Sequence, residues 1–131
     1  MNYLIQFVKY AIGLFYLVGG PLIHAYFMTQ QRALYSMLAD QAWPLYQTLW
    51  NNLVLPNLMP LVVLLVIFEM AAGWLMVSRR PQRAQLGQLA GLIFNLLLIP
   101  FWFFYGLPNL LLVLAHGGLL FWERFESPTE R

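Results

Sequence analysis

The stretch that decides the fold is NLMPLVVLLVIFEMAAGWLMVS, residues 57–78, in which Glu69 is the only ionisable side chain. A helix needs about 20 largely apolar residues to cross the hydrocarbon core of a bilayer. A spanning segment must also satisfy its own backbone hydrogen bonds, and a chain this small cannot close a barrel to do so. The stretch therefore predicts a membrane-spanning helix.

Three other stretches have a similar composition. Residues 4–28 and 84–105 are long enough to span, and residues 108–122 form a shorter apolar stretch that suits a thin bilayer or an upright helix. Of the 131 residues, 61% are hydrophobic and only 9% are charged, whereas a soluble domain carries about a quarter charged residues. We therefore predict an all-α membrane four-helix bundle, a single four-span domain over residues 1–125, with a short disordered cytoplasmic tail at residues 126–131.

The segment between the first and second predicted spans, residues 29–56, has a pattern of its own. Leu45, Leu49 and Leu53 repeat every four residues, and Pro44 is a suitable first residue for a helix. The Trp and Tyr residues among them have amphipathic rings that favour the level of the lipid headgroups. We predict an extra interfacial amphipathic helix here, lying on the outer surface.

Basic residues set the predicted orientation. Residues 79–83, between the second and third spans, read RRPQR, and Lys9, Arg124 and Arg131 fall on the same side if the spans alternate. The other side keeps only Arg32. Because basic residues gather on the cytoplasmic side of membrane proteins, we predict a multi-pass protein with both termini in the cytoplasm, typical of a bacterial inner membrane.

Composition also excludes several kinds of chemistry. The chain has no cysteine, which removes disulfides, thiolate metal sites and dithiol redox chemistry. Its net charge of +2 is too small to indicate nucleic-acid binding. We predict membrane lipid as a partner, and neither nucleic acid nor a metal site.

Polar residues lie about midway along three of the predicted spans, at Glu69, Asn95 and His116. An ionisable residue inside a span is a functional hypothesis by default, because a carboxylate removed from water is costly. We predict that these three residues form a polar intramembrane cluster. Asn95 has the alternative of a packing residue that bonds across helices, and for Glu69 a purely structural role stays equally open.

The two histidines are candidate cofactor ligands. His24 shares one helical face with Lys9, Gly13, Tyr16 and Gly20. The depths of His24 and His116 differ by about one helical turn, roughly 5 Å, so that both could ligate one haem. The alternatives are a neutral His116 that bonds Glu69, and an interfacial His24 near the outer end of its span.

Small residues predict where helices pack closely, because they let backbones approach. The glycines expected at such contacts are Gly13, Gly20, Gly73, Gly87, Gly91 and Gly117.

The order of these features matters for a comparison with known families. Residues 13–20 form a glycine-rich end of the first span, and a long outer segment follows. In residues 68–77, FEMAAGWLMV, Gly73 follows Glu69 by four residues and the run leads into a basic turn. Small residues then begin the third span, over residues 84–91.

In this order and spacing, over about residues 11–122, the chain resembles the DoxX-like family of small four-span membrane proteins. The resemblance implies a four-helix bundle associated with membrane redox chemistry, in some members as the membrane subunit of a thiosulfate:quinone oxidoreductase. Among individual residues, the resemblance extends only to Glu69 and Gly73. His24 and His116 depart from the family pattern.

The favoured hypothesis is a small integral membrane subunit associated with membrane redox chemistry that interacts with quinone. Glu69 and His116 would then exchange protons near the quinone ring. Haem or pigment ligation by His116 with His24 is a variant. The alternatives are a non-catalytic accessory subunit that packs on a larger membrane complex or on its own copies, and a small proton-coupled transporter. The sequence leaves open whether the chain is an enzyme, and catalytic residues stay unknown.

Overall fold

The computed structural model describes residues 3–30 and 32–126, and it describes the side chains of these residues except at 102–105 and 123–126. The described residues form helices joined by short turns, and they contain no strand. The predicted all-α fold class is confirmed. Residues 127–131, most of the predicted tail, lie outside the described residues.

The first helical stretch runs without a break from Tyr3 to Gln30, over 28 residues. It consists of α1 (Tyr3–Leu14), the π-helical turn η1 (Phe15–Gly19) and α2 (Gly20–Gln30). Pro21 is the second residue of α2, two positions after the end of η1. Because proline has no backbone N–H, it leaves the carbonyl of Leu17 without its usual helical partner, and the wider turn lies where the regular ladder is interrupted.

The second stretch runs from Pro44 to Met76, over 33 residues. It comprises α4 (Pro44–Leu49), the π-helical η2 (Trp50–Val54), the 3-10 turn η3 (Leu55–Asn57) and α5 (Leu58–Met76). A separate short helix, α3 (Ala33–Asp40), precedes it. The segment between the first two predicted spans therefore contains two short helices, where the leucine pattern predicted one, and α4 begins at the predicted Pro44.

The third stretch ends earlier than the sequence predicted. It consists of α6 (Pro81–Leu98) and the 3-10 turn η4 (Ile99–Phe101), and α7 (Trp102–Glu126) follows at once. Pro100 is the physical reason, because its missing N–H and its ring prevent the helix from continuing. Residues 102–105, predicted as the end of the third span, therefore begin α7 instead.

Three helical stretches are long and apolar enough to cross a membrane, Tyr3–Gln30, Pro44–Met76 and Pro81–Phe101. Residues 106–122 of α7 form a shorter apolar helix. These counts refer to the residues that the structure describes.

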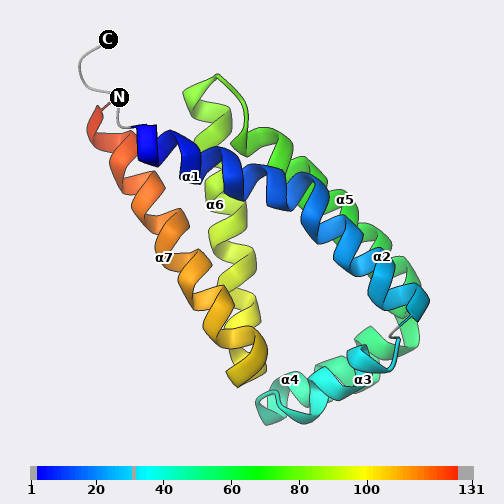
Figure 1. Ribbon diagram of the computed structural model, residues 1–131. Helices are drawn as coiled ribbons and strands as arrows, with labels where there is room; N and C mark the ends of the chain where they lie inside the picture. Colours follow the sequence, from blue (N-terminus) through cyan, green and yellow to red (C-terminus); the bar gives the residue numbers. More distant parts are fainter. Residues whose placement is uncertain (1–2, 31, 127–131) are drawn as a thin grey trace.

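The helices form two arms that meet at one end (Figure 1). α1 and α2 lie along α5 in one arm, and α6 and α7 lie along each other in the second. The arms separate away from the α5–α6 turn, and α3 and α4 cross between them at the open end. We call the closed end, which carries the exposed Arg79, Arg80 and Arg83, the arginine end, and the other the α3–α4 end.

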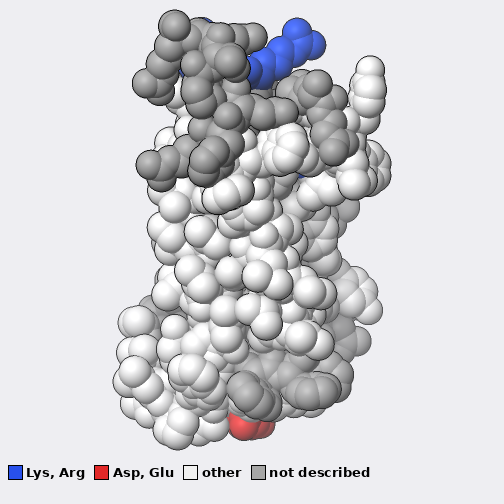
Figure 2. Space-filling model, turned by 90° about the vertical axis from the view of Figure 1, so that its left-hand side faces the viewer, with Lys and Arg blue, Asp and Glu red and all other residues white. Residues whose placement is uncertain are grey.

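Among the residues whose side chains are described, the exposed charged ones lie toward the two ends of the molecule. On the face in Figure 2, Lys and Arg side chains appear toward the arginine end, while the broad middle is almost wholly uncharged among the described residues. Large apolar side chains such as Phe7, Leu64 and Leu111 are exposed along the helices. An uncharged apolar belt between charged ends suits a protein that lies in a bilayer.

Two apolar clusters pack α5 against its neighbouring helices. The first, toward the arginine end of α5, contains Tyr16, Ala72 and Met76. The second, toward the α3–α4 end, contains Tyr35, Leu58 and Val62. Glu69 falls between them along α5.

At the α3–α4 end, residues in and next to α4 contact η4 and so link the two arms. The backbone N–H of Trp43 donates to the carbonyl of Pro100 at 3.1 Å. The rings of Tyr46 and Trp50 pack edge-on against Phe101, with centroid distances of 5.6 and 4.8 Å. These contacts tie the α3–α4 segment to the arm that contains α6 and α7.

Candidate functional site

Glu69 is placed by close packing between α2 and α5. Its residue is only 6% exposed. A Cβ atom added to Gly20 would lie 2.6 Å from Oε2 of Glu69 and 2.9 Å from Oε1. The absence of a side chain at Gly20 therefore makes the room that the carboxyl group occupies.

One carboxyl oxygen of Glu69 faces a histidine on the neighbouring helix. Nε2 of His24 lies 3.5 Å from Oε1 of Glu69. The other ring nitrogen, Nδ1, lies 2.8 Å from the hydroxyl of Tyr35, and the two rings stack at 6.3 Å with an interplanar angle of 21°. Both nitrogens of His24 therefore have partners, one toward α5 and one toward α3.

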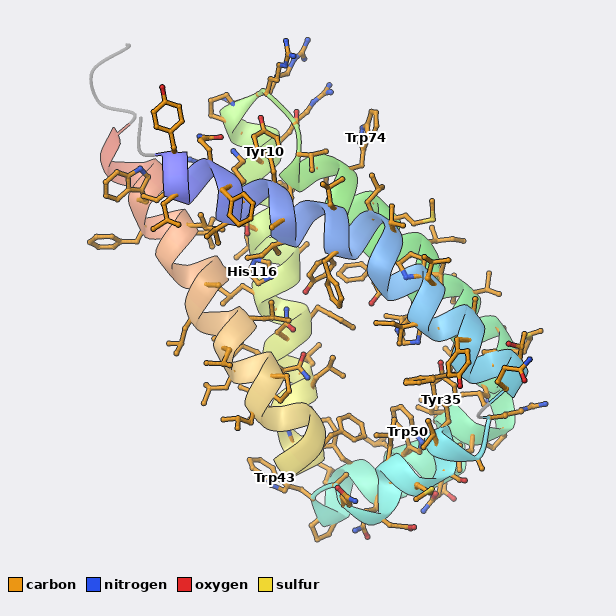
Figure 3. The ribbon with its side chains drawn as sticks, in the orientation of Figure 1. Tyr10, Tyr35, Trp43, Trp50, Trp74 and His116 are labelled. Carbon is orange, nitrogen blue, oxygen red and sulfur yellow. The ribbon has the colours of Figure 1, made fainter. Side chains whose placement is uncertain are left out.

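Tyr35 is fixed in turn by Trp50. The indole N–H of Trp50 donates to the backbone carbonyl of Tyr35 at 2.6 Å. Figure 3 shows both side chains at the junction of α2, α3 and α5. We refer to Glu69, His24 and Tyr35 as the Glu69 chain, because hydrogen-bonding atoms connect them in that order from mid-helix to the α3–α4 end.

A second polar group surrounds Tyr16. Asn95 donates through Nδ2 to the Tyr16 hydroxyl and, at 2.7 Å, to the carbonyl of Gly91. His116, labelled in Figure 3, packs edge-on against the Tyr16 ring at a centroid distance of 5.7 Å. Nδ1 of His116 lies 2.5 Å from Oε1 of Gln88. We call Tyr16, Gln88, Asn95 and His116 the Tyr16 group.

The structure thus divides the predicted polar cluster. Asn95 and His116 both contact Tyr16, while Glu69 is paired with His24 on the other arm of the molecule. His116 has Gln88 as its hydrogen-bond partner, where the sequence offered Glu69 as an alternative. Asn95 bonds across helices, as its structural alternative predicts. His24, offered as an interfacial residue, lies half-buried between α3 and α5.

Three buried polar atoms have no hydrogen-bond partner among the described residues. They are Oε2 of Glu69, Nε2 of Gln88 and Nε2 of His116. Leaving a buried polar atom unpaired costs free energy, and such atoms in native proteins call for an explanation in function or bound solvent. One of the three lies at the end of the Glu69 chain.

The histidines do not fit a shared haem. Both ring nitrogens of His24 are already engaged. Nε2 of His116 lies where a Cβ on Gly91 would be only 2.6 Å away, so that the α6 backbone covers the nitrogen that would bind iron. Among the described residues, no group of three or more His, Asp or Glu side chains could hold a metal ion.

Most of the predicted glycines lie at close helix contacts. A Cβ on Gly73 would meet the backbone carbonyl oxygen of Gly13 at 2.6 Å, and one on Gly87 would meet the backbone nitrogen of Met76 at 2.6 Å. Gly117 does not follow this pattern, since a Cβ there would meet nothing within 4 Å. His116 points toward Tyr16 and α6, so that the next residue, about 100° further around the helix, points away.

Two members of these groups were not expected from the sequence. Gln88 is fully buried and lies on the same stripe of α6 as Gly87, Gly91 and Asn95. That spacing could have identified it, because positions three, four and seven residues apart share a helix face. Tyr35 has no comparable signal, since its contact with His24 depends on how α3 folds back.

The chain was compared with protein-family models, curated proteins and solved structures, and none of the three comparisons found a match.

Proposed function

We propose that this chain is a four-span membrane protein in which Glu69 handles protons for membrane redox chemistry at a lipid-soluble quinone. The observation that carries the proposal is the Glu69 carboxyl group. One oxygen faces His24, and the other is buried without a partner among the described residues. A carboxyl held so deep in an apolar bundle is costly, and it persists where function requires it.

The quinone is proposed from the chemistry of the site and its surroundings. A quinone takes up two protons with two electrons on reduction, so that its site needs a proton donor and acceptor within the bilayer. Oε2 of Glu69 can accept a hydrogen bond when ionised and donate one when protonated. The resemblance to the DoxX-like family, which remains an expectation from the sequence, implies the same redox context.

The topology belongs to the proposal. We take the 25-residue helix α7 as the fourth span, because at 1.5 Å per residue it is roughly 37 Å long and exceeds the hydrocarbon thickness. The arginine end then faces the cytoplasm of a bacterial inner membrane together with both termini, and α3 and α4 lie at the outer surface.

A binding measurement tests the function. The protein is incorporated into lipid nanodiscs and titrated with a short-chain quinone and its quinol, while tryptophan fluorescence reports binding. We expect Glu69→Gln to weaken binding about tenfold or more, because hydrogen bonds to charged groups contribute about 1.5–3 kcal/mol. Asp40→Asn is the matched control, since Asp40 is exposed at the end of α3. Equal binding by the wild type and Glu69→Gln would remove Glu69 from the site.

The Glu69 chain favours one further candidate, a small proton-coupled transporter. A chain of hydrogen-bonding groups that begins at a buried carboxyl serves proton-coupled transport as well as quinone chemistry. A wild type that binds no quinone but carries proton-driven substrate flux in vesicles would favour transport. Co-purification with a large membrane complex would instead assign an accessory role in that complex.

A further inference from the structure

We infer that Glu69 exchanges protons with one face of the membrane only, the face at the α3–α4 end, through His24 and Tyr35. The inference deepens the proposed function, on which it rests for the role of Glu69 in handling protons. It adds the side of the membrane with which Glu69 exchanges protons, which neither the sequence nor that proposal specifies.

Hydrogen-bonding atoms connect Glu69 toward the α3–α4 end. The chain runs from Oε1 of Glu69 to Nε2 of His24 at 3.5 Å, and from Nδ1 of His24 to the Tyr35 hydroxyl at 2.8 Å. An imidazole that accepts a proton on one nitrogen and releases one from the other can pass a proton without turning. Tyr35 belongs to α3, which crosses the open end of the molecule (Figure 1).

The proton transfer balances along this chain. The Tyr35 hydroxyl gives its proton to Nδ1 of His24 while Nε2 gives its proton to Oε1 of Glu69. The O–H bond of tyrosine and the Nε2–H bond of histidine break, and new N–H and carboxyl O–H bonds form. Tyr35 is only 4% exposed, so a local opening of α3 lets water at the α3–α4 end return a proton to the Tyr35 oxygen.

Close apolar packing separates Glu69 from the arginine end. Gly73, one turn from Glu69, is packed so tightly that a Cβ would meet the Gly13 carbonyl oxygen and the Leu17 nitrogen, each at 2.6 Å. Met76, one turn further, is 0% exposed. Two helix backbones in contact leave no file of water between them, so this packing acts as a seal.

The Tyr16 group does not bridge that seal by hydrogen bonds. Tyr16 and His116 are titratable and face the interior from the first helix and from α7, and Lys9 lies further toward the arginine end on the same face as Tyr16. Oε2 of Glu69 has no hydrogen-bond partner among the described residues, while the Tyr16 hydroxyl bonds Asn95 and Nδ1 of His116 bonds Gln88. The Tyr16 group is therefore the competing route to test.

Carbodiimide labelling in sided vesicles tests the inference. Dicyclohexylcarbodiimide crosses membranes and adds to the protonated form of a carboxylic acid, and mass spectrometry quantifies the adduct on Glu69. The protein is reconstituted into proteoliposomes with impermeant buffers, and the pH is set independently on each side. The chain lacks cysteine, so Gln82→Cys and an impermeant maleimide assign the orientation of the protein in the vesicles.

We expect labelling of Glu69 to follow the pH on the α3–α4 side, falling about tenfold for each pH unit once the ionised form dominates. Changing the pH on the arginine side should leave labelling unchanged. Labelling that follows the arginine side would assign the route to the Tyr16 group, and labelling that follows both sides or neither would equally overturn the inference. None of these readouts uses quinone, so this result and the quinone-binding result can fail independently.

A variant tests the part assigned to Tyr35. In Tyr35→Phe, brief carbodiimide pulses at increasing times after a pH change on the α3–α4 side should show a delayed response of Glu69. Tyr10→Phe is the matched control, because Tyr10 is exposed toward the arginine end (Figure 3). A response in Tyr35→Phe as prompt as in the control would remove Tyr35 from the route, and circular dichroism confirms that both variants are folded.

Discussion

At the scale of single residues, the position of Glu69 depends on the absence of a side chain at Gly20. The carboxyl group fills the volume that a side chain at residue 20 would take, and this brings Oε1 within reach of His24. A glycine here is therefore part of the site, although it contributes no functional group. Its role differs from that of Gly13 and Gly73, which bring two backbones together.

Gly20→Ala tests this relation. The added methyl group must displace the Glu69 carboxyl, and overpacking of this kind typically costs about 1–3 kcal/mol. We expect a lower unfolding temperature in detergent and an altered response of Glu69 to carbodiimide. Gly118→Ala is the matched control, because a Cβ at Gly118 meets nothing within 4 Å. Equal effects of the two substitutions would contradict the packing described for Gly20.

The bond between Tyr16 and Asn95 gives a second residue-scale prediction. Tyr16→Phe removes the hydroxyl that accepts from Asn95, while the amide keeps its bond to the Gly91 carbonyl. Hydrogen bonds between membrane helices average about 0.6 kcal/mol, so we expect a small loss of stability. Unfolding followed in mixed micelles measures it, and a loss of several kcal/mol would mean that the hydroxyl has a larger structural role.

At the scale of helices, the attachment of α4 to η4 determines whether the α3–α4 segment stays in place. The ring of Phe101 packs against the rings of Tyr46 and Trp50. The indole N–H of Trp50 also donates to the backbone carbonyl of Tyr35. The ring of Phe101 thereby connects the arm that contains α6 to Tyr35, the residue of the Glu69 chain that lies at the α3–α4 end. Losing that ring should loosen α3 and α4 without unfolding the longer helices.

Phe101→Ala should therefore expose the α3–α4 segment to protease. Each aromatic pair contributes about 0.5–1.5 kcal/mol beyond the area that it buries, and both are lost. We expect faster trypsin cleavage after Arg32, which is exposed just before α3. Phe7→Ala removes an exposed ring from α1 and should leave the cleavage rate unchanged. Cleavage at the wild-type rate in Phe101→Ala would show that other contacts hold the segment.

At the scale of the whole molecule, charge at the two ends predicts how the protein sits in the membrane. Arg79, Arg80 and Arg83 are exposed at the α5–α6 turn, and the belt between the ends is apolar. Because basic loops are retained in the cytoplasm, the arginine end should face inward. Helix packing alone would permit either orientation.

Cysteine labelling in intact cells measures this orientation. Gln82→Cys, at the arginine end, should resist an impermeant maleimide until the membrane is permeabilised. Gln41→Cys, exposed between α3 and α4, should react from outside. The wild type gives a clean background, since it has no cysteine. The reverse labelling pattern would invert the proposed topology and the direction of proton access with it.

The sequence by itself determined the helical class, the apolar stretches and the burial cost of Glu69, because hydropathy and helical spacing are local properties of the chain. It did not determine which polar residues meet. Glu69 pairs with His24 because Gly20 leaves room between α2 and α5, and His24 reaches Tyr35 because α3 folds back across the open end. His116 pairs with Gln88 because α7 follows α6 directly after Pro100. Each of these contacts depends on how neighbouring helices are rotated and where each one ends, and only close packing in three dimensions decides that.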